Sequence, residues 1–157
     1  MGRQLSQNLK ALLQDVGEGA VLMNLALRLY GHPEWRVFRN YAEAGCDLLL
    51  LRTAEDRKSK QIKVEVKTRQ NVLTDRASKN AVHFTLSQSE RDSADFLVAY
   101  WFERNDFFVV PTNKLHPINA SGKKVFKFIA YLKADGTYNE STNSALGKWD
   151  LILDKLS

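Results

Sequence analysis

The hydrophobic positions at the start of the chain recur with the period of an α-helix. Residues 4–15 carry an apolar stripe made by Leu5, Leu9, Leu12 and Leu13. A second stripe predicts a helix from about Glu18 to Tyr30, ending at Gly31. Gly17 lies between the two stripes, and glycine disfavours a helix interior. The pattern therefore predicts two consecutive helices.

Three strands are predicted next. In residues 35–40, Trp35, Val37 and Arg39 alternate with more polar neighbours, apart from Phe38. Cys46–Leu51 is mostly apolar, as in a strand buried on both faces. In the stretch that starts at Ile62, IKVEVKTRQ, the apolar residues Ile62, Val64 and Val66 alternate with charged residues. Residues 53–60 are polar and connect the last two strands, which are expected to form an antiparallel hairpin.

The remaining pattern mixes both kinds of element. A basic, polar segment covers residues 70–80, and the capping-box spacing of Ser87 and Glu90 predicts a short helix over 88–94. Aromatic and β-branched residues predict strands at 96–102, 107–110 and 125–132, with a turn at Arg104 and Asn105 between the first two. A last helix is predicted over 144–156. This order predicts an α/β (α+β) fold in which helices flank a central mixed β-sheet.

Composition narrows the class of protein. At 157 residues and 44% hydrophobic content, the chain is expected to form a single domain over residues 1–157. No segment resembles a signal peptide or a membrane span, and Cys46 is the only cysteine, so a reduced, cytoplasmic protein is expected. The net charge of +5 favours a polyanionic partner, although charge alone is a weak indication.

Three carboxylates occupy unusual positions in this pattern. Glu65 lies among cations on the polar face of the Ile62 strand, where it either balances charge in solvent or takes part in a site with Lys67. Asp47 opens the apolar strand that precedes it, and burial of an unpaired carboxylate is costly. Glu18 extends the apolar stripe of the second predicted helix, in a first turn whose dipole favours negative charge. Each position alone is also compatible with a solvated charge.

Together these residues resemble the PD-(D/E)xK nuclease superfamily, which has the restriction-endonuclease-like fold. The resemblance rests on Gly17-Glu18 opening a helix, Gly45-Cys46-Asp47 entering an apolar strand, and Glu65-Val66-Lys67 on the next strand. It extends loosely as far as Pro111, and residues 112–157 carry no matching motif. Cys46 stands where the name of the motif has proline, at a position that does not bind metal.

The resemblance implies a role for each matching residue. Asp47, Glu65 and the backbone carbonyl of Val66 would coordinate Mg²⁺, for which Mn²⁺ could substitute. Lys67 would orient the attacking water and stabilise charge on the phosphate. Glu18 would support the site, directly or through water, or hold a second ion. The implied activity is metal-dependent endonucleolytic hydrolysis of DNA.

The implied partner is DNA, and a homodimer would allow both strands to be cut. Its expected contact surface flanks the site and consists of Lys63, Arg69, Arg76 and Lys79. Two alternatives remain open at this point. One is a nucleic-acid-binding module of the same fold without turnover, and the other is an interaction domain whose basic face binds a partner protein.

Overall fold

One long helix opens the computed structural model, which describes residues 5–42, 45–53, 60–70 and 80–157. Helix α1 (Gln7–Arg28) continues into the 3-10 helix η1 (Leu29–Gly31). The prediction of two helices separated at Gly17 was wrong. A Cβ atom at Gly17 would lie 1.7 Å from Oγ1 of Thr68, so the glycine lets α1 pack closely on a strand instead of ending a helix.

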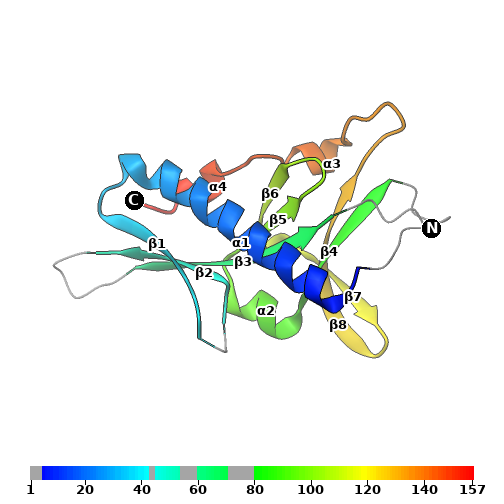
Figure 1. The fold of residues 1–157 in the computed structure, drawn as a ribbon, viewed down its shortest axis with the longest axis horizontal. Helices are drawn as coiled ribbons and strands as arrows, with labels where there is room; N and C mark the ends of the chain where they lie inside the picture. The colour runs from blue at the N-terminus through cyan, green and yellow to red at the C-terminus, as the bar shows by residue number, and fades with distance from the viewer. Residues whose placement is uncertain (1–4, 43–44, 54–59, 71–79) are drawn as a thin grey trace.

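A five-stranded mixed sheet lies at the centre of the fold (Figure 1). Its strands, in spatial order, are β1 (Trp35–Arg39), β2 (Leu48–Arg52), β3 (Gln61–Arg69), β5 (Phe96–Trp101) and β6 (Asp106–Pro111). Strands β2 and β3 pair antiparallel, as predicted, whereas β3 and β5 pair parallel. The predicted turn before β6 is also present, and Asn105 has a positive φ of 53° there.

A second, three-stranded sheet was not predicted. It consists of β4 (Ala81–Ser87), β8 (Lys123–Tyr131) and β7 (His116–Ala120), in the order β4-β8-β7. Only β8 was expected from the sequence. All five residues of β7 are exposed, so this strand has no buried face to produce an alternating pattern. The short helix α2 (Gln88–Ser93) follows β4 and has the predicted capping box.

Two hydrophobic cores lie on opposite faces of the central sheet. On one face, α1 packs through Val21 and Leu25 against Val64 and Val66 of β3. On the other face, the three-stranded sheet packs against alternate residues of β5, such as Leu97. Figure 1 shows α1 running across the central sheet, with α2 below it in this view. The alternation of β3 therefore directs its even-numbered residues towards α1 and its odd-numbered residues towards the other layer.

The C-terminal segment differs from the predicted single helix over 144–156. It contains two short helices, α3 (Glu140–Asn143) and α4 (Asp150–Leu153), with Gly147 at a positive φ of 61° between them. The amide of Gly147 donates to the carbonyl of Phe107, so this segment covers the outer edge of β6. Among the described residues, none of the helices has the length and apolar character needed to cross a membrane.

Candidate active site

The candidate site forms where β2 begins and β3 extends past it. Leu48 pairs with Val64, so the backbone of β3 beyond Val64 has no strand on this side. Asp47 forms the hydrogen bonds that a further strand residue would otherwise form there. Its Oδ2 atom accepts a hydrogen bond from the Val66 amide at 2.8 Å, and its own amide donates to the Val64 carbonyl at 3.1 Å. Asp47 is thus fixed at the sheet edge by β3 itself.

Helix α1 brings two polar residues to the same edge. The Gln14 Nε2 atom donates to the Val66 carbonyl at 2.7 Å and to Glu18 Oε1 at 3.2 Å. Burial raises the pKa of Glu18, and the nearby negative charge of Asp47 raises it further. Glu18 therefore faces Asp47 across the sheet edge. The expectation that Glu18 lies in a first helical turn was wrong, because α1 begins at Gln7.

Glu65 lies on the opposite face of β3 and is only 4% exposed. Burial is the main cause that raises its pKa to about 9, followed by a hydrogen bond with Glu90 and the charge of Asp47. This burial rules out the reading in which Glu65 balances charge in solvent. The ionised form of this carboxyl group is therefore disfavoured even though the Lys67 ammonium lies nearby.

Lys67 and Glu90 complete a triad with Glu65. The Lys67 ammonium forms an ion pair with Glu90 and lies 3.5 Å from Glu65 Oε1. Burial alone would lower the pKa of Lys67, but the two glutamates raise it overall. Burial alone would likewise raise the pKa of Glu90, yet its hydrogen bonds with Glu65 and Lys67 lower it to about 2. Lys67 is therefore a charged donor with a fixed position.

Arg39 of β1 forms the outer rim of the site. Its Nη1 atom lies 2.6 Å from Asp15 Oδ1 and 3.9 Å from Glu18 Oε2. Because Asp15 is largely exposed, the closer pair contributes little to stability. Its effect on the site is electrostatic, since the guanidinium opposes the increase in the Glu18 pKa.

The oxygen atoms at this edge are of the kind that a hard cation prefers, but they are not arranged around a common point. Carboxylate oxygens and the Val66 carbonyl are the ligands that Mg²⁺ prefers. Within the ranges that the structure describes, however, no group of three Asp, Glu, His or Cys side chains is placed to hold a metal ion. Glu65 is hydrogen-bonded to Glu90 instead. The Val66 carbonyl accepts a hydrogen bond from Gln14.

The residues expected to contact nucleic acid are only partly described. Lys63 and Arg69 lie on the same face of β3 as Glu65, at either side of it. The Arg69 Nε atom donates to the His83 carbonyl at 3.0 Å, which links the end of β3 to β4. Arg76 and Lys79 lie outside the described residues, so the expectation for them stays a prediction.

Sequence reasoning missed Gln14, Arg39 and Glu90 as parts of this site. Gln14 and Glu18 are four residues apart, the spacing that places side chains side by side on a helix. The supposed break at Gly17 concealed that relation. Glu90 was assigned to the capping box, in which its Oε1 does accept the Ser87 amide, but its second oxygen pairs with Lys67. No sequence signal indicates that second contact.

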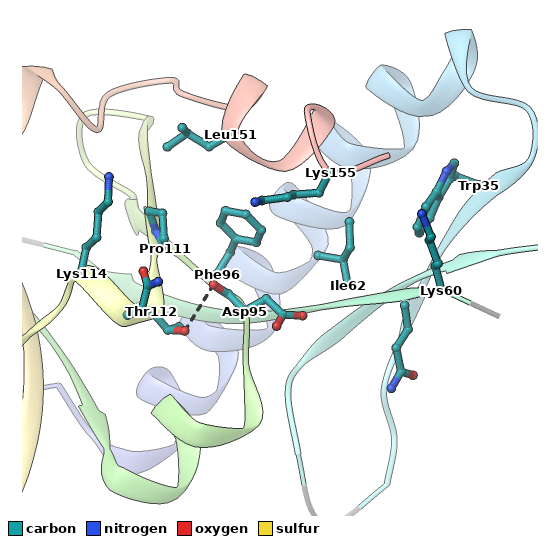
Figure 2. Close-up of a pocket in the computed structure, with 12 residues that line it drawn as sticks. Trp35, Lys60, Ile62, Asp95, Phe96, Pro111, Thr112, Lys114, Leu151 and Lys155 are labelled. Carbon is teal, nitrogen blue, oxygen red and sulfur yellow. Dashed lines mark hydrogen bonds between the residues drawn. The ribbon is translucent and has the colours of Figure 1, made fainter. Parts of the chain in front are cut away.

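A cavity of about 740 Å³ lies elsewhere. It adjoins the first residues of β3, and Figure 2 shows Ile62 and Phe96 between Lys60 on one side and Lys114 on the other. Its one carboxylate, Asp95, accepts the Lys63 amide at 2.9 Å and supports the backbone. We therefore place the chemistry at the carboxylates of the sheet edge and not in this cavity.

The chain has the restriction-endonuclease-like fold. Among solved structures, the bacterial homing endonuclease I-Ssp6803I is similar to this chain with a TM-score of 0.59 and 20% identity, covering 93% of each chain. The Holliday junction resolvase Hjc of Archaeoglobus fulgidus gives a TM-score of 0.48 and 14% identity, covering 85% of this chain and 94% of its own. No protein-family model matches the sequence, and no curated protein matches it. The similarity to the homing endonuclease confirms the predicted fold.

Proposed function

We propose that this protein is a metal-dependent endonuclease that hydrolyses phosphodiester bonds in DNA. The observation that supports the proposal is the position of Asp47, whose charge raises the pKa of Glu18 on one face of β3 and of Glu65 on the other. Lys67 lies beside Glu65 and forms an ion pair with Glu90. The similarity in fold to a homing endonuclease supports the same class of substrate. The positively charged Lys63 and Arg69 flank the triad and suit a polyanionic strand.

Asp47, Glu18, Glu65 and the Val66 carbonyl would hold the divalent ion. These groups fit the ion by donor type and charge, because they gather acids whose mutual repulsion a cation relieves. When bound, Mg²⁺ would lower the pKa of a coordinated water and neutralise charge on the phosphodiester.

Lys67 would contact the substrate, whereas Glu90 and Asp47 would hold other groups of the site in position. The Lys67 ammonium would donate hydrogen bonds to a phosphate oxygen and stabilise the negative charge that develops there. Glu90 is a positioning residue that keeps Lys67 charged and directed towards the edge of β3. Asp47 keeps the Val66 peptide in place through its hydrogen bond to the amide.

The test compares wild type with Glu65→Gln and Lys67→Ala in cleavage of linear, supercoiled and branched DNA, with Mg²⁺, Mn²⁺ or chelator. Both variants should lose at least about 100-fold in rate, because each removes charge stabilisation at the reacting phosphate. Glu65→Gln should also lose the rise in melting temperature that Mg²⁺ produces, whereas Lys67→Ala should keep it.

The matched control is Glu140→Gln, which makes the same glutamate-to-glutamine change at an exposed position in α3. It should cleave DNA at the wild-type rate. Variants of Glu65 and Lys67 that also cleave at the wild-type rate would disprove the proposal. DNA binding without cleavage by wild type under every condition would favour the alternative of an inactive binding module.

A further inference from the structure

One segment of the chain carries all of its excess positive charge. Residues 107–134 contain no aspartate or glutamate, and they contain five lysines. The other 18 of the 23 lysines and arginines are balanced by the 18 aspartates and glutamates elsewhere, so the net charge of +5 comes from this segment. Strands β7 and β8 lie within it. A polyanion would therefore be attracted to this part of the surface.

Three of these lysines lie on β8, towards the tip of the β7–β8 hairpin. Strand β4 pairs with β8 only from Val125 onwards, whereas β7 pairs with it as far as Lys123. The tip of the hairpin, residues 119–124, therefore extends past β4 as a two-stranded arm (Figure 1). Ser121 and Gly122 connect its strands with φ values of 50° and 76°, which are typical of a tight two-residue turn. The arm is thus a short ribbon whose geometry is fixed by its own turn.

Protection of a sheet edge does not account for these lysines. Lysine on an edge strand prevents that strand from pairing with another chain. Here, however, β7 is the edge strand and the lysines lie on β8, the central strand of its sheet. Lys123 and Lys124 are exposed and Lys127 is half-buried, and none of the three forms an ion pair with a described residue. The described part of the chain therefore leaves their charges without a neutralising acid.

Helix α2 connects the hairpin to the candidate active site. The Arg91 guanidinium lies over the Phe126 ring of β8, 5.1 Å from the ring centroid, and the Lys124 ammonium lies 5.6 Å from the same centroid. Glu90, the residue before Arg91, forms the ion pair with Lys67. Two neighbouring residues of α2 thus contact the hairpin and the triad. The hairpin is therefore held in a fixed position relative to the lysine that is proposed to contact the reacting phosphate.

We propose that the β7–β8 hairpin binds duplex DNA, with its arm in the major groove and its lysines on phosphates that lie away from the bond to be cut. The inference rests on the proposed function for the identity of the polyanion. A two-stranded β-ribbon fits the major groove, where a phosphate backbone runs along each side of it. Strand alternation places Lys123 and Lys127 on one face of the ribbon and Lys124 on the other, so each face offers a cation. Residues 119–124 contain no large apolar side chain of the kind that anchors a protein partner.

The test measures the affinity of the full chain for a duplex of about 30 base pairs by fluorescence anisotropy, in chelator and over a range of salt concentrations. Lys123→Gln combined with Lys124→Gln should weaken binding and reduce the slope of log K against log salt by about 2, because two fewer phosphates are neutralised. Lys123→Arg combined with Lys124→Arg keeps both charges and should retain the wild-type slope. An unchanged slope for the glutamine variant would overturn the proposal.

Lys148→Gln combined with Lys155→Gln is the matched control, because it removes the same net charge at exposed positions on either side of α4. It should keep the wild-type slope, and an equal decrease in both glutamine variants would mean that net charge and not the hairpin determines binding. Melting curves establish that each variant is folded. A wild type that does not bind DNA would also overturn the proposal and would favour an acidic protein as the partner of the hairpin.

Cleavage is not needed for this measurement, so the two proposals fail separately. A wild type that binds with the hairpin-dependent slope but never cleaves would disprove the nuclease function and leave the DNA-binding hairpin in place. A wild type that cleaves, while its glutamine variant keeps the wild-type slope, would do the opposite.

Discussion

Glu65 and Glu90 share a proton in a buried site, and this arrangement has a cost in stability. Glu65 keeps its proton up to a pKa of about 9, whereas Glu90 stays ionised down to about 2. Both groups have ordinary values near 4.5 in the unfolded chain. The folded protein therefore holds one proton more than the unfolded chain between pH 4.5 and 9, and one fewer between pH 2 and 4.5.

This difference predicts the pH dependence of unfolding in the presence of chelator. The contribution of the pair to the free energy of unfolding should rise from pH 2 to 4.5 and fall from pH 4.5 to 9, by at most about 1.4 kcal/mol per pH unit. Glu65→Gln removes the group that holds the extra proton, so the variant should be more stable than wild type near pH 8. Urea unfolding of both proteins from pH 5 to 9 measures the difference. Parallel profiles would show that Glu65 does not retain its proton.

The packing of α1 on β3 is the contact between elements on which the site depends. It places Gln14 and Glu18 beside Val66 and Asp47, and it requires a residue without a side chain at Gly17. The same contact explains why one helix replaces the two predicted. A glycine in a helix interior destabilises the helix, but the burial of the apolar residues of α1 against the sheet stabilises it by more.

Gly17→Ala should therefore destabilise the protein by about 1–3 kcal/mol, although alanine is the better helix former. The cause is overlap with Thr68, and Thr68→Ala in the same chain should recover part of the loss because it removes Oγ1 and Cγ2. Gly31→Ala is the control, since a Cβ there meets no atom within 4 Å. Urea denaturation measures all three. An equal effect of the two glycine substitutions would show that close packing is not the reason for Gly17.

At the scale of the whole molecule, the C-terminal residues complete the core on the α1 side. Trp149, Ile152 and Leu156 belong to the same buried cluster as Val21 and Val64. The Trp35 indole also donates to the Leu156 carbonyl at 3.0 Å. The last third of the chain, which carries no recognisable motif, is thus part of the structure that supports β3.

Ile152→Ala should lower the free energy of unfolding by about 2–5 kcal/mol, because it leaves a cavity in this core. Leu151→Ala, one residue earlier on the outer side of α4, should change it by no more than about 0.5 kcal/mol. Denaturation followed by tryptophan fluorescence and by circular dichroism gives both values. If the C-terminal residues and the central sheet share one core, fluorescence and circular dichroism report the same unfolding transition for each variant. A small effect of Ile152→Ala would mean that α4 docks only loosely.

The elements that have a buried face could be predicted from the sequence, because burial leaves a pattern of apolar positions. The alternation of β3, the apolar run of β2, the capping box of α2 and the paired strands β5 and β6 were all predicted close to their observed bounds. The same patterns indicated Asp47, Glu65, Lys67 and Glu18 as candidates, since charges that interrupt apolar patterns are visible locally.

Features that depend on contacts between distant segments could not be predicted from the sequence. The role of Gly17 is set by Thr68, and the second partner of Glu90 is set by Lys67; neither pair is close in the sequence. Strand β7 left no pattern because it is exposed throughout, and the segment around Gly147 forms turns because its backbone bonds to β6. Local patterns record which side of an element is buried, but not which residue it is buried against.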